Sequence, residues 1–354
     1  MFLKRCIIIN TILHIITGLN IGGAENMLYK LINYTFKDNK HIVVSLTQNG
    51  KVGKKINDMG VEVISLNMTK SLNIINKIIW LKKIIKNKNP DLVQTWLYHS
   101  DLIGGLAAKF AFNGPVVWNI RHSNLNIDAN KRTTIWTAKL SAKLSNKIPE
   151  KIISCSKAAK KIHSNIGYNK DKIKVIPNGF DISKFNKDFY NIKDIYNELN
   201  ISEDIFLIGM VGRYNPQKDY QNLLNAALLL KKQKYKLYKK VNFVLCGRNV
   251  DNTNSDLISF LNKHKMGSNF HLLGERNDIP LIMASLDMFT LSSLGEGFSN
   301  VIGEAMASRT PCVVTNVGDS AYIVGNSGVV VPPKKPKQLM KGWMKILTIT
   351  NKKR

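Results

Sequence analysis

The stretch from Glu296 to Ala307 reads EGFSNVIGEAMA and decides more about this 354-residue chain than any other. Its two carboxylates, Glu296 and Glu304, have seven residues between them; the first adjoins a glycine and the second lies in an apolar run. A helix that begins near Ser299 would present free backbone amides, which favour an anion. Glu304 inside that helix is costly unless ribose hydroxyls or backbone amides bind it. The stretch therefore predicts a loop and a helix start that bind an anion.

Short apolar runs alternate with segments of helical period on both sides of this stretch. Solidly apolar strands are typical of a parallel sheet that is covered on both faces. The expected strands are 12–17, 41–47, 61–66, 91–97, 116–120, 151–155 and 173–176, then 205–211, 241–246, 270–273, 288–291, 311–315 and 328–331. The two series predict an α/β chain of two Rossmann-like domains facing each other across a cleft, with ligands at the C-terminal strand ends.

A polar segment rich in Asn, Lys and Asp separates the two series. We expect an N-terminal domain at residues 1–181, a linker at 182–204 and a C-terminal domain at 205–354. The sequence PNGFD at 177–181 predicts a turn at the boundary, because proline and Asn-Gly both favour turns.

The net charge of the chain is unusual, since 52 Lys and Arg residues against 24 Asp and Glu give +28. Such a field attracts polyanions, which include anionic membrane surfaces, nucleic acids and phosphorylated substrates. A genome-wide bias toward Lys, Asn and Ile explains the same charge, so selection for a membrane surface is one of two interpretations. The sequence has no recognisable nucleic-acid module with interleaved aromatics.

The cysteines Cys6, Cys155, Cys246 and Cys312 form no C-x-x-C pair, which disfavours a zinc site or a disulfide framework. Reduced, buried thiols of a cytoplasmic protein are expected. The apolar stretch 6–18 resembles a signal peptide, but polar residues interrupt it and no small-x-small cleavage site follows. A first buried strand is the better interpretation. The sequence contains no run of about 18 apolar residues, so we predict no membrane span.

Paired glycines, Gly22 and Gly23, stand between an expected strand and an expected helix. They allow a close backbone approach to a ligand, and the helix start behind them favours a phosphate. A tight strand–helix turn is an equally good explanation. The dinucleotide pattern G-x-G-x-x-G is absent, which disfavours a nicotinamide cofactor.

Polar side chains follow two other expected strands, in WLYHSD at 96–101 and RHSN at 121–124. Both fall at the edge of the sheet where ligands bind, so we expect His99 and Arg121 there. The alternative is that Ser100 or Asp101 caps a helix and His99 is merely exposed.

Two cations, Arg213 and Lys218, follow the glycine that ends an expected strand in GRYNPQKD at 212–219. Arginine offers a bidentate fork and lysine a compact charge, and together they suit a pyrophosphate leaving group. A solvated basic loop is the alternative in a chain this rich in lysine.

Taken jointly, these motifs resemble glycosyltransferase family 4, a group of retaining GT-B enzymes, and its bacterial branch that builds surface polysaccharide and lipopolysaccharide. The resemblance runs from about Thr11 to Ile346. The motifs that carry it are Gly22–Glu25, Pro177–Gly179, Leu273–Pro280, Ser292–Ala307, Thr315–Asp319 and Val331–Pro333.

The resemblance implies a role for each matching residue. Arg213 and Lys218 would bind the donor diphosphate, Glu304 the ribose hydroxyls and Glu296 the transferred sugar. The remaining donor-binding residues would be Gly22, Gly23, Arg276, Gly297, Phe298, Ser299 and Asn300. His99 would belong to the catalytic residues, with Arg121 and His122 on the acceptor side.

The resemblance also implies a front-face mechanism with neither cofactor nor metal, and the sequence has no D-x-D motif. The expected partners are a nucleotide sugar, a glycan or lipid-linked acceptor and an anionic membrane surface, with no specific nucleic acid. We expect a cytoplasmic protein, peripheral on the inner face of the plasma membrane.

Three features depart from the family pattern. Residues 1–10 resemble an addition, Asn249 stands where a glycine is common, and the chain ends at Arg354 before the usual final helix that crosses back to the first domain. Asn tolerates left-handed backbone angles, so we expect little effect at Asn249. An inactive GT-B scaffold and a GT-B sugar-nucleotide epimerase are the alternative functions.

Overall fold

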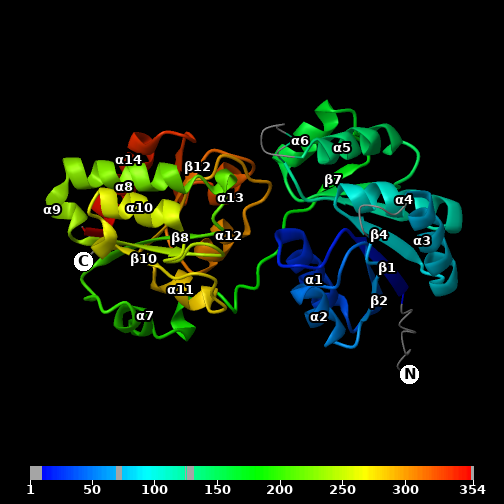
Figure 1. Cartoon of the computed structure of the whole chain (residues 1–354), viewed down its shortest axis with the longest axis horizontal. Helices are drawn as coiled ribbons and strands as arrows, with labels where there is room; N and C mark the ends of the chain where they lie inside the picture. The colour runs from blue at the N-terminus through cyan, green and yellow to red at the C-terminus, as the bar shows by residue number, and fades with distance from the viewer. Residues whose placement is uncertain (1–9, 69–73, 124, 126–130, 352–354) are drawn as a thin grey trace, which may run out of the picture. The chain divides into compact units, whose positions relative to one another are not determined.

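A computed structural model describes residues 10–68, 74–123, 125 and 131–351 (Figure 1). The chain divides into two compact units between Asn178 and Gly179, inside the expected boundary turn. Each unit is an α/β domain built on its own parallel sheet. Residues 1–9, which include Cys6, lie outside the described residues.

The described residues of the first unit form a sheet of seven parallel strands in the order β3-β2-β1-β4-β5-β6-β7. The strands are β1 (Asn10–Ile16), β2 (Asn39–Ser45), β3 (Glu62–Ser65), β4 (Leu92–Trp96), β5 (Val116–Ile120), β6 (Lys151–Ser154) and β7 (Ile173–Val175). The helices are α1 (Gly23–Thr35), α2 (Lys51–Asn57), α3 (Ile74–Lys88), α4 (Tyr98–Ala111), α5 (Arg132–Leu144) and α6 (Lys157–Asn165). The apolar stretch at the N-terminus therefore contains a strand, as expected.

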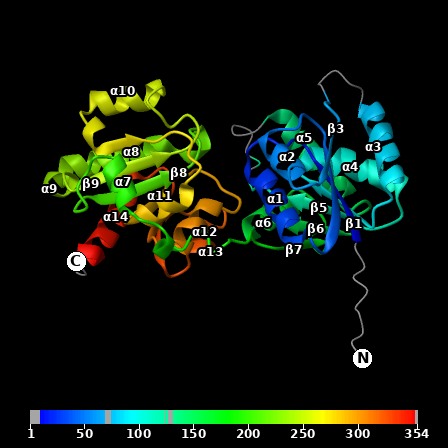
Figure 2. The ribbon, with the colours of Figure 1, turned by 90° about the horizontal axis from the view of Figure 1, so that it is seen from below.

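The central strand β1 explains why its sequence is solidly apolar. Leu13 and Ile15 belong to one buried cluster, whereas Ile16 belongs to another. Successive side chains of a strand point to opposite faces of the sheet, so helices cover this sheet on both faces. Figure 2 shows α3 beside α4 and α1 beside α2, and the contacts within each pair agree.

The second unit is built on six parallel strands in the order β10-β9-β8-β11-β12-β13. The strands are β8 (Phe206–Val211), β9 (Val241–Cys246), β10 (Phe270–Leu272), β11 (Met288–Leu291), β12 (Cys312–Thr315) and β13 (Gly328–Val331). The helices are α7 (Lys193–Glu198), α8 (Tyr220–Gln233), α9 (Tyr235–Tyr238), α10 (Ser255–Lys263), α11 (Ile279–Ser285), α12 (Asn300–Ala307), α13 (Ser320–Val324) and α14 (Pro336–Asn351), with 3-10 turns η2 (Lys187–Phe189), η3 (Pro216–Lys218) and η4 (Gly267–Asn269). Cys155, Cys246 and Cys312 are buried, as expected.

Both sheets reverse their strand order at one place, between β1 and β4 in the first unit and between β8 and β11 in the second. At such a switch point the two connections leave to opposite sides, so the C-terminal strand ends border a crevice where ligands bind. The segments that follow these four strands are therefore the places to look for a site.

The expected linker at 182–204 is a folded part of the second unit rather than a loose connection. It contains η2 and α7, and its side chains Ile195 and Tyr196 are buried in the core of that unit. Arg276 binds Glu198 of α7 through two hydrogen bonds of 2.5 and 3.0 Å. Because most residues of the segment are polar, its sequence did not predict that these few apolar side chains would be buried.

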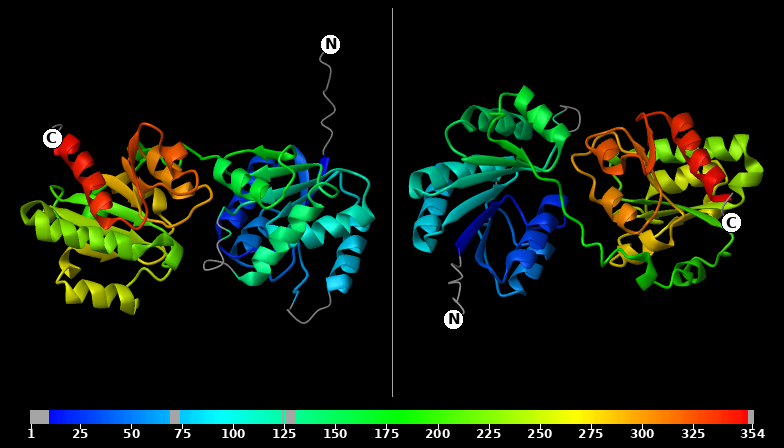
Figure 3. Two further views of the ribbon diagram at one scale, coloured as in Figure 1. Left: turned by 90° about the horizontal axis from the view of Figure 1, so that it is seen from above. Right: turned by 180° about the vertical axis from the view of Figure 1, so that it is seen from behind.

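The C-terminal helix α14 packs against α8 of the second unit, as the red helix in Figure 3 shows. Its Trp343 is fully buried and donates a hydrogen bond of 3.0 Å from Nε1 to Thr290 Oγ1 on β11. Among the described residues, no helix has both the length and the apolar composition that a bilayer span requires.

A chain of buried hydrogen bonds ties β1 and β2 to α1 in the first unit. Thr35 Oγ1 donates to Leu31 O at 2.7 Å, so it accepts from His41 Nε2 at 3.0 Å. His41 Nδ1 then accepts from His14 Nε2 at 3.0 Å, and His14 Nδ1 accepts from Trp96 Nε1 at 3.4 Å. This series of hydrogen bonds requires both His14 and His41 to be neutral.

We expect acid to destabilise the first unit through two of its buried histidines, His14 and His163. Burial lowers the pKa of His14 from 6.5 to about 3 and that of His163 to about 4. Below pH 6.5 the unfolded chain binds protons that the folded chain refuses, so stability falls as the pH falls from 6.5 toward 4. At about 1.4 kcal/mol per pH unit, His14 alone removes about 3 kcal/mol by pH 4.

Urea unfolding at pH 7, 5.5 and 4 measures this loss. In the His14→Gln variant the amide can accept from Trp96 and donate to His41 without titrating, so its stability should fall about 3 kcal/mol less than that of the parent. Parallel pH profiles for the two proteins would contradict the assignment.

Candidate active site

The loops after β8, β9 and β10 converge at the C-terminal edge of the second sheet. Gly212 N donates to Cys246 O at 2.8 Å, and Gly247 N donates to Gly274 O at 2.7 Å. A Cβ on Gly247 would lie 2.2 Å from Gly212 O, so only glycine permits this approach. Asn249 follows with φ +60°, the left-handed conformation that asparagine was expected to tolerate.

An ion pair spans the switch point of the second sheet. Lys218, from η3 after β8, binds Glu296, from the loop after β11, with 2.7 Å between Nζ and Oε1. The two side chains are only 17% and 11% exposed. Ser293 Oγ donates a further hydrogen bond of 2.6 Å to the same carboxylate oxygen. Two residues proposed from separate motifs therefore meet at the place where the fold predicts a ligand.

Backbone contacts hold the loop that carries Glu296 on both sides. Leu294 N donates to Gln217 O at 2.8 Å, and Asp319 N donates to Gly297 O at 3.1 Å. Gly318 adopts φ +56°, and a Cβ there would lie 2.0 Å from Glu296 O. The glycine turn after β12 thus fixes the position of the carboxylate at the end of β11.

Helix α12 begins directly after this loop, with Ser299 as its N-cap. Ser299 is almost fully buried, and no group among the described residues forms a hydrogen bond with its Oγ. Phe180 packs its ring against Gly303 and stacks on Phe298 with 6.1 Å between ring centroids. The helix start thus places backbone amides beside a buried hydroxyl that has no partner among the described residues, which suits a bound anion.

The other donor-side predictions have different surroundings. Glu304 is half-buried in the second turn of α12, and Asn300 is half-buried at its first position. Arg213 is exposed, and within the described part of the chain no hydrogen bond or ion pair holds its guanidinium. Arg276 is committed to structure: its fork binds Glu198 and Asp278 in two bidentate pairs, which raise its pKa.

The segments that follow β1 and β4 meet at the switch point of the first sheet. Thr17 Oγ1 after β1 lies 3.0 Å from Ser100 Oγ at the start of α4. Gly23 has open space around its missing side chain, whereas the space beside Gly22 is filled by the Glu25 carboxylate. Gly23 is therefore the more approachable of the two glycines.

The junction between β4 and α4 is strained. Leu97 adopts φ +75° and ψ 154°, a conformation that is otherwise almost restricted to glycine. Asp101 is fully buried one turn later and accepts a hydrogen bond of 2.5 Å from Thr95 Oγ1. Burial raises the pKa of Asp101 and lowers that of the half-buried His99, which favours neutral groups at both positions.

Arg121 is held by groups that two separate motifs supply. Its guanidinium donates to Asn178 at 2.7 Å and to Asn119 at 3.2 Å, and it lies 4.7 Å from the centroid of the Trp96 ring. Burial lowers its pKa. The Arg121 guanidinium is therefore engaged mainly in holding neighbouring residues in place, and less available to bind a ligand.

His122 is half-buried, and its ring meets that of Tyr98 edge-on with 6.4 Å between centroids. Tyr98 donates a hydrogen bond of 2.6 Å to His163 Nε2, because His163 Nδ1 donates to Ala159 O at 2.7 Å. The Tyr98–His163 pair had no signal in the sequence, since the partners are separated by 65 positions.

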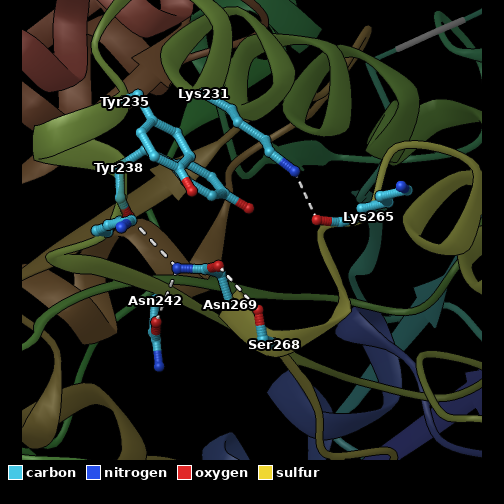
Figure 4. A pocket seen from close by; sticks show the side chains of 8 residues that line it. Lys231, Tyr235, Tyr238, Asn242, Lys265, Ser268 and Asn269 are labelled. Atoms are coloured by element: carbon cyan, nitrogen blue, oxygen red, sulfur yellow. Dashed lines mark hydrogen bonds between the residues drawn. The ribbon is translucent and has the colours of Figure 1, made fainter.

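Two hollows of about 370 and 420 Å³ lie on the second unit, away from the strand ends described above. Lysines and tyrosines line both, and Figure 4 shows hydrogen bonds among the residues of the first. Lys231 Nζ donates to Lys265 O at 2.5 Å, and Asn269 Nδ2 donates to Val241 O at 2.9 Å. Among the described residues, no three His, Cys, Asp or Glu side chains form a cluster that could hold a metal ion.

Two family models match this chain. The model described as Glycosyltransferase Family 4 matches residues 21–184, and the model described as Glycosyl transferases group 1 matches residues 205–348. Together they match most of both units.

The chain is 27% identical over 337 residues to the N,N'-diacetylbacillosaminyl-diphospho-undecaprenol alpha-1,3-N-acetylgalactosaminyltransferase of Campylobacter jejuni, covering 91% of this chain and 86% of that protein. It is 30% identical over 256 residues to the UDP-Gal:alpha-D-GlcNAc-diphosphoundecaprenol alpha-1,3-galactosyltransferase of Escherichia coli, covering 70% and 64%.

Among solved structures, the fold matches Anabaena Alr3699/HepE in complex with UDP, with a TM-score of 0.82 at 21% identity over 97% of this chain and 91% of that one. This likeness agrees with the two Rossmann-like units of a GT-B fold. With both family models matched and both sheets in place, the chain belongs to the group 1, family 4 glycosyltransferases.

Proposed function

We propose that this glycosyltransferase moves a sugar from a nucleotide-sugar donor to a lipid-linked glycan in bacterial surface-polysaccharide synthesis, with retention of configuration and without a metal. The observation that carries the proposal is the Lys218–Glu296 pair at the switch point of the second sheet, next to the start of α12. The printed names of two relatives support the acceptor class, since both specify an acceptor on diphospho-undecaprenol.

The donor diphosphate would lie between the α12 helix start and the two cations. The amides of residues 297–300 and the hydroxyl of Ser299 would donate to its oxygens, and Arg213 and Lys218 would compensate its charge. Glu304 would accept from the ribose hydroxyls, and Glu296 from hydroxyls of the transferred sugar. Arg276 would support this site by holding the loop after β10 and α7 in place, because its own fork is occupied.

In the proposed reaction, the bond between the anomeric carbon and the β-phosphate oxygen breaks with both electrons going to the diphosphate. An acceptor oxygen attacks the same face and forms the new glycosidic bond, while its proton passes to the departing phosphate oxygen. Fixed cations and helix amides stabilise the negative charge that develops on the diphosphate, so the step needs neither a protein nucleophile nor a metal.

On the acceptor side, His99 would accept a hydrogen bond from an acceptor hydroxyl, since burial favours its neutral form. The open space at Gly23 would let a ligand come close to the protein backbone there. Arg121 and His122 would shape the surface around the acceptor. We further propose that the protein works at the inner face of the plasma membrane, to which its charge of +28 attracts it.

A screen of the full chain against common sugar nucleotides, with EDTA present, tests the proposal. We expect one donor to raise the melting temperature selectively and to be hydrolysed slowly. Loss of both effects in EDTA, with recovery on adding Mg²⁺ or Mn²⁺, would contradict metal independence. A folded protein that responds to no donor would favour the inactive-scaffold alternative.

Variants of the donor site should separate binding from turnover. Glu304→Gln should weaken donor binding roughly tenfold, because it removes a charged acceptor of ribose hydrogen bonds. Arg213→Ala should lower kcat more than it raises KM, since its charge acts on the developing diphosphate. Calorimetry and steady-state kinetics measure these effects, and kinetics unchanged in both variants would refute the site assignment.

A further inference from the structure

The outward face of α3 in the first unit combines exposed apolar side chains with lysines. Ile75, Ile79 and Trp80 are 59%, 47% and 49% exposed. At 100° per residue, Lys83 and Lys86 lie on the same side of the helix as the two isoleucines, and both are exposed. Figure 2 shows α3 at the border of this unit, alongside α4.

Folding of the unit does not require these apolar side chains. The opposite face of α3 supplies the core contacts through buried Leu81 and Ile85, with Ile78 and Ile84 packed against the same cluster. Trp80 and Ile79 are therefore large apolar side chains that the fold leaves about half exposed on the surface.

The charge of α3 has one sign only. Its sequence IINKIIWLKKIIKNK contains five lysines and no acidic residue. Lys88 is paired with Glu62 at 2.6 Å, whereas Lys83 and Lys86 are exposed on the same side as Ile79. Lysines can extend their ammonium groups to lipid phosphates while tryptophan and isoleucine enter the boundary between headgroups and acyl chains.

We infer that the outward face of α3 is the surface by which this protein docks on an anionic lipid bilayer, lying in the plane of the interface. The inference rests on the proposed membrane attachment and names the element responsible for it. The occupant is a bilayer because the face is both basic and apolar with a tryptophan among its apolar residues; a purely electrostatic partner would not use the exposed Ile79 and Trp80.

The test is flotation of the full chain with vesicles of phosphatidylcholine, with and without 30% phosphatidylglycerol, at about 0.1 M salt, where charges act over about 10 Å. Lys82→Gln/Lys83→Gln/Lys86→Gln should weaken binding to anionic vesicles roughly 100-fold. Ile79→Ser/Trp80→Ser should weaken it roughly tenfold or more. Ile79, Trp80, Lys83 and Lys86 are exposed and Lys82 is half-buried, so the melting temperature should change little.

The second unit supplies a matched control. Its segment 231–240 reads KKQKYKLYKK, and Lys232, Lys236 and Lys240 are exposed. Changing these three to Gln removes the same charge from another surface. We expect nearly the parent's binding; if this variant loses binding and the α3 variants keep it, the docking surface lies elsewhere and the inference is wrong.

Fluorescence adds a readout specific to insertion. Trp96, Trp118 and Trp343 are buried, and Trp136→Phe removes the other exposed tryptophan, so Trp80 reports on the interface. Anionic vesicles should shift its emission to the blue, and lipids brominated near the headgroup should quench it. An unchanged spectrum on bound protein would overturn insertion. Self-association that depends on Ile79 and Trp80, with vesicle binding unchanged, would replace the bilayer with a second copy.

Donor hydrolysis without lipid separates this inference from the proposed function. Variants of α3 that lose vesicle binding but hydrolyse donor at the parent rate support the inference. Variants that bind vesicles like the parent and still hydrolyse donor would overturn the docking surface and leave the transferase proposal standing.

Discussion

Replacing Lys218 with methionine should lower kcat for sugar transfer about 10²–10³-fold, with a smaller effect on KM. Lys218 Nζ lies 2.7 Å from Glu296 in a largely buried position at the switch point, where the donor diphosphate is proposed to leave. Methionine keeps an unbranched apolar stem about as long as that of lysine but removes the charged ammonium group. The transition state, which carries the most negative charge on the diphosphate, should therefore suffer more than the bound donor.

Initial rates of transfer and of donor hydrolysis measure this loss. Lys236→Met, at an exposed lysine of α9, is the matched control and should leave the rates unchanged. Since Lys218→Met also leaves Glu296 without its cation, the double variant with Glu296→Gln shows whether a stranded carboxylate causes the defect. If Lys218→Met turned over within threefold of the parent, the cation would have no catalytic role.

Gly318→Ala should have the largest structural effect of a single methyl group in the second unit. The residue has φ +56°, which costs alanine about 1–2 kcal/mol, and the new Cβ would lie 2.0 Å from Glu296 O and 2.7 Å from Gly297 O. Both contacts are backbone atoms that cannot rotate away. We expect a loss of about 2–4 kcal/mol of stability and a displaced Glu296 loop.

Gly60→Ala is the control, because Gly60 also has a positive φ, +83°, but nothing within 4 Å of the missing side chain. It should cost only about 1 kcal/mol and leave the donor site intact. Urea unfolding and donor affinity measured on both variants isolate the clash from the backbone strain. Equal losses in the two variants would mean that the Glu296 loop adjusts freely.

Most strands could be predicted from the sequence because they are short, solidly apolar runs. Val116–Ile120, Val241–Cys246, Met288–Leu291 and Gly328–Val331 begin and end at the expected residues, and every other strand lies within two residues of its expected bounds. Burial on both faces of a parallel sheet leaves little freedom in composition, which makes such strands recognisable.

The segment at 182–204 could not be read in the same way. A few buried side chains, such as Ile195 and Tyr196, attach it to the second unit amid many polar neighbours. The pairing of Arg276 with Glu198 was equally hidden, since 78 positions separate the partners. Local composition does not reveal a contact that only tertiary folding creates.

The site shows the same division. Motif order placed Lys218 and Glu296 at the ends of strands, and the strand order brought them together. Arg276 and Arg121 instead form hydrogen bonds with other side chains of the protein. These bonds depend on side-chain geometry, which a sequence motif does not specify. The closing of the two domains around one cleft and the catalytic roles stay predictions.

The folded segment after Gly179 has a practical consequence for dividing this protein. A fragment that begins at residue 205 would lose the Ile195 and Tyr196 contacts, and it would leave Arg276 without Glu198. It would also lose the Phe180 ring that packs on Gly303 of α12. A self-sufficient second unit must therefore start at Gly179, so the unit of folding, and the smallest piece worth exchanging between related enzymes, is longer than its sheet.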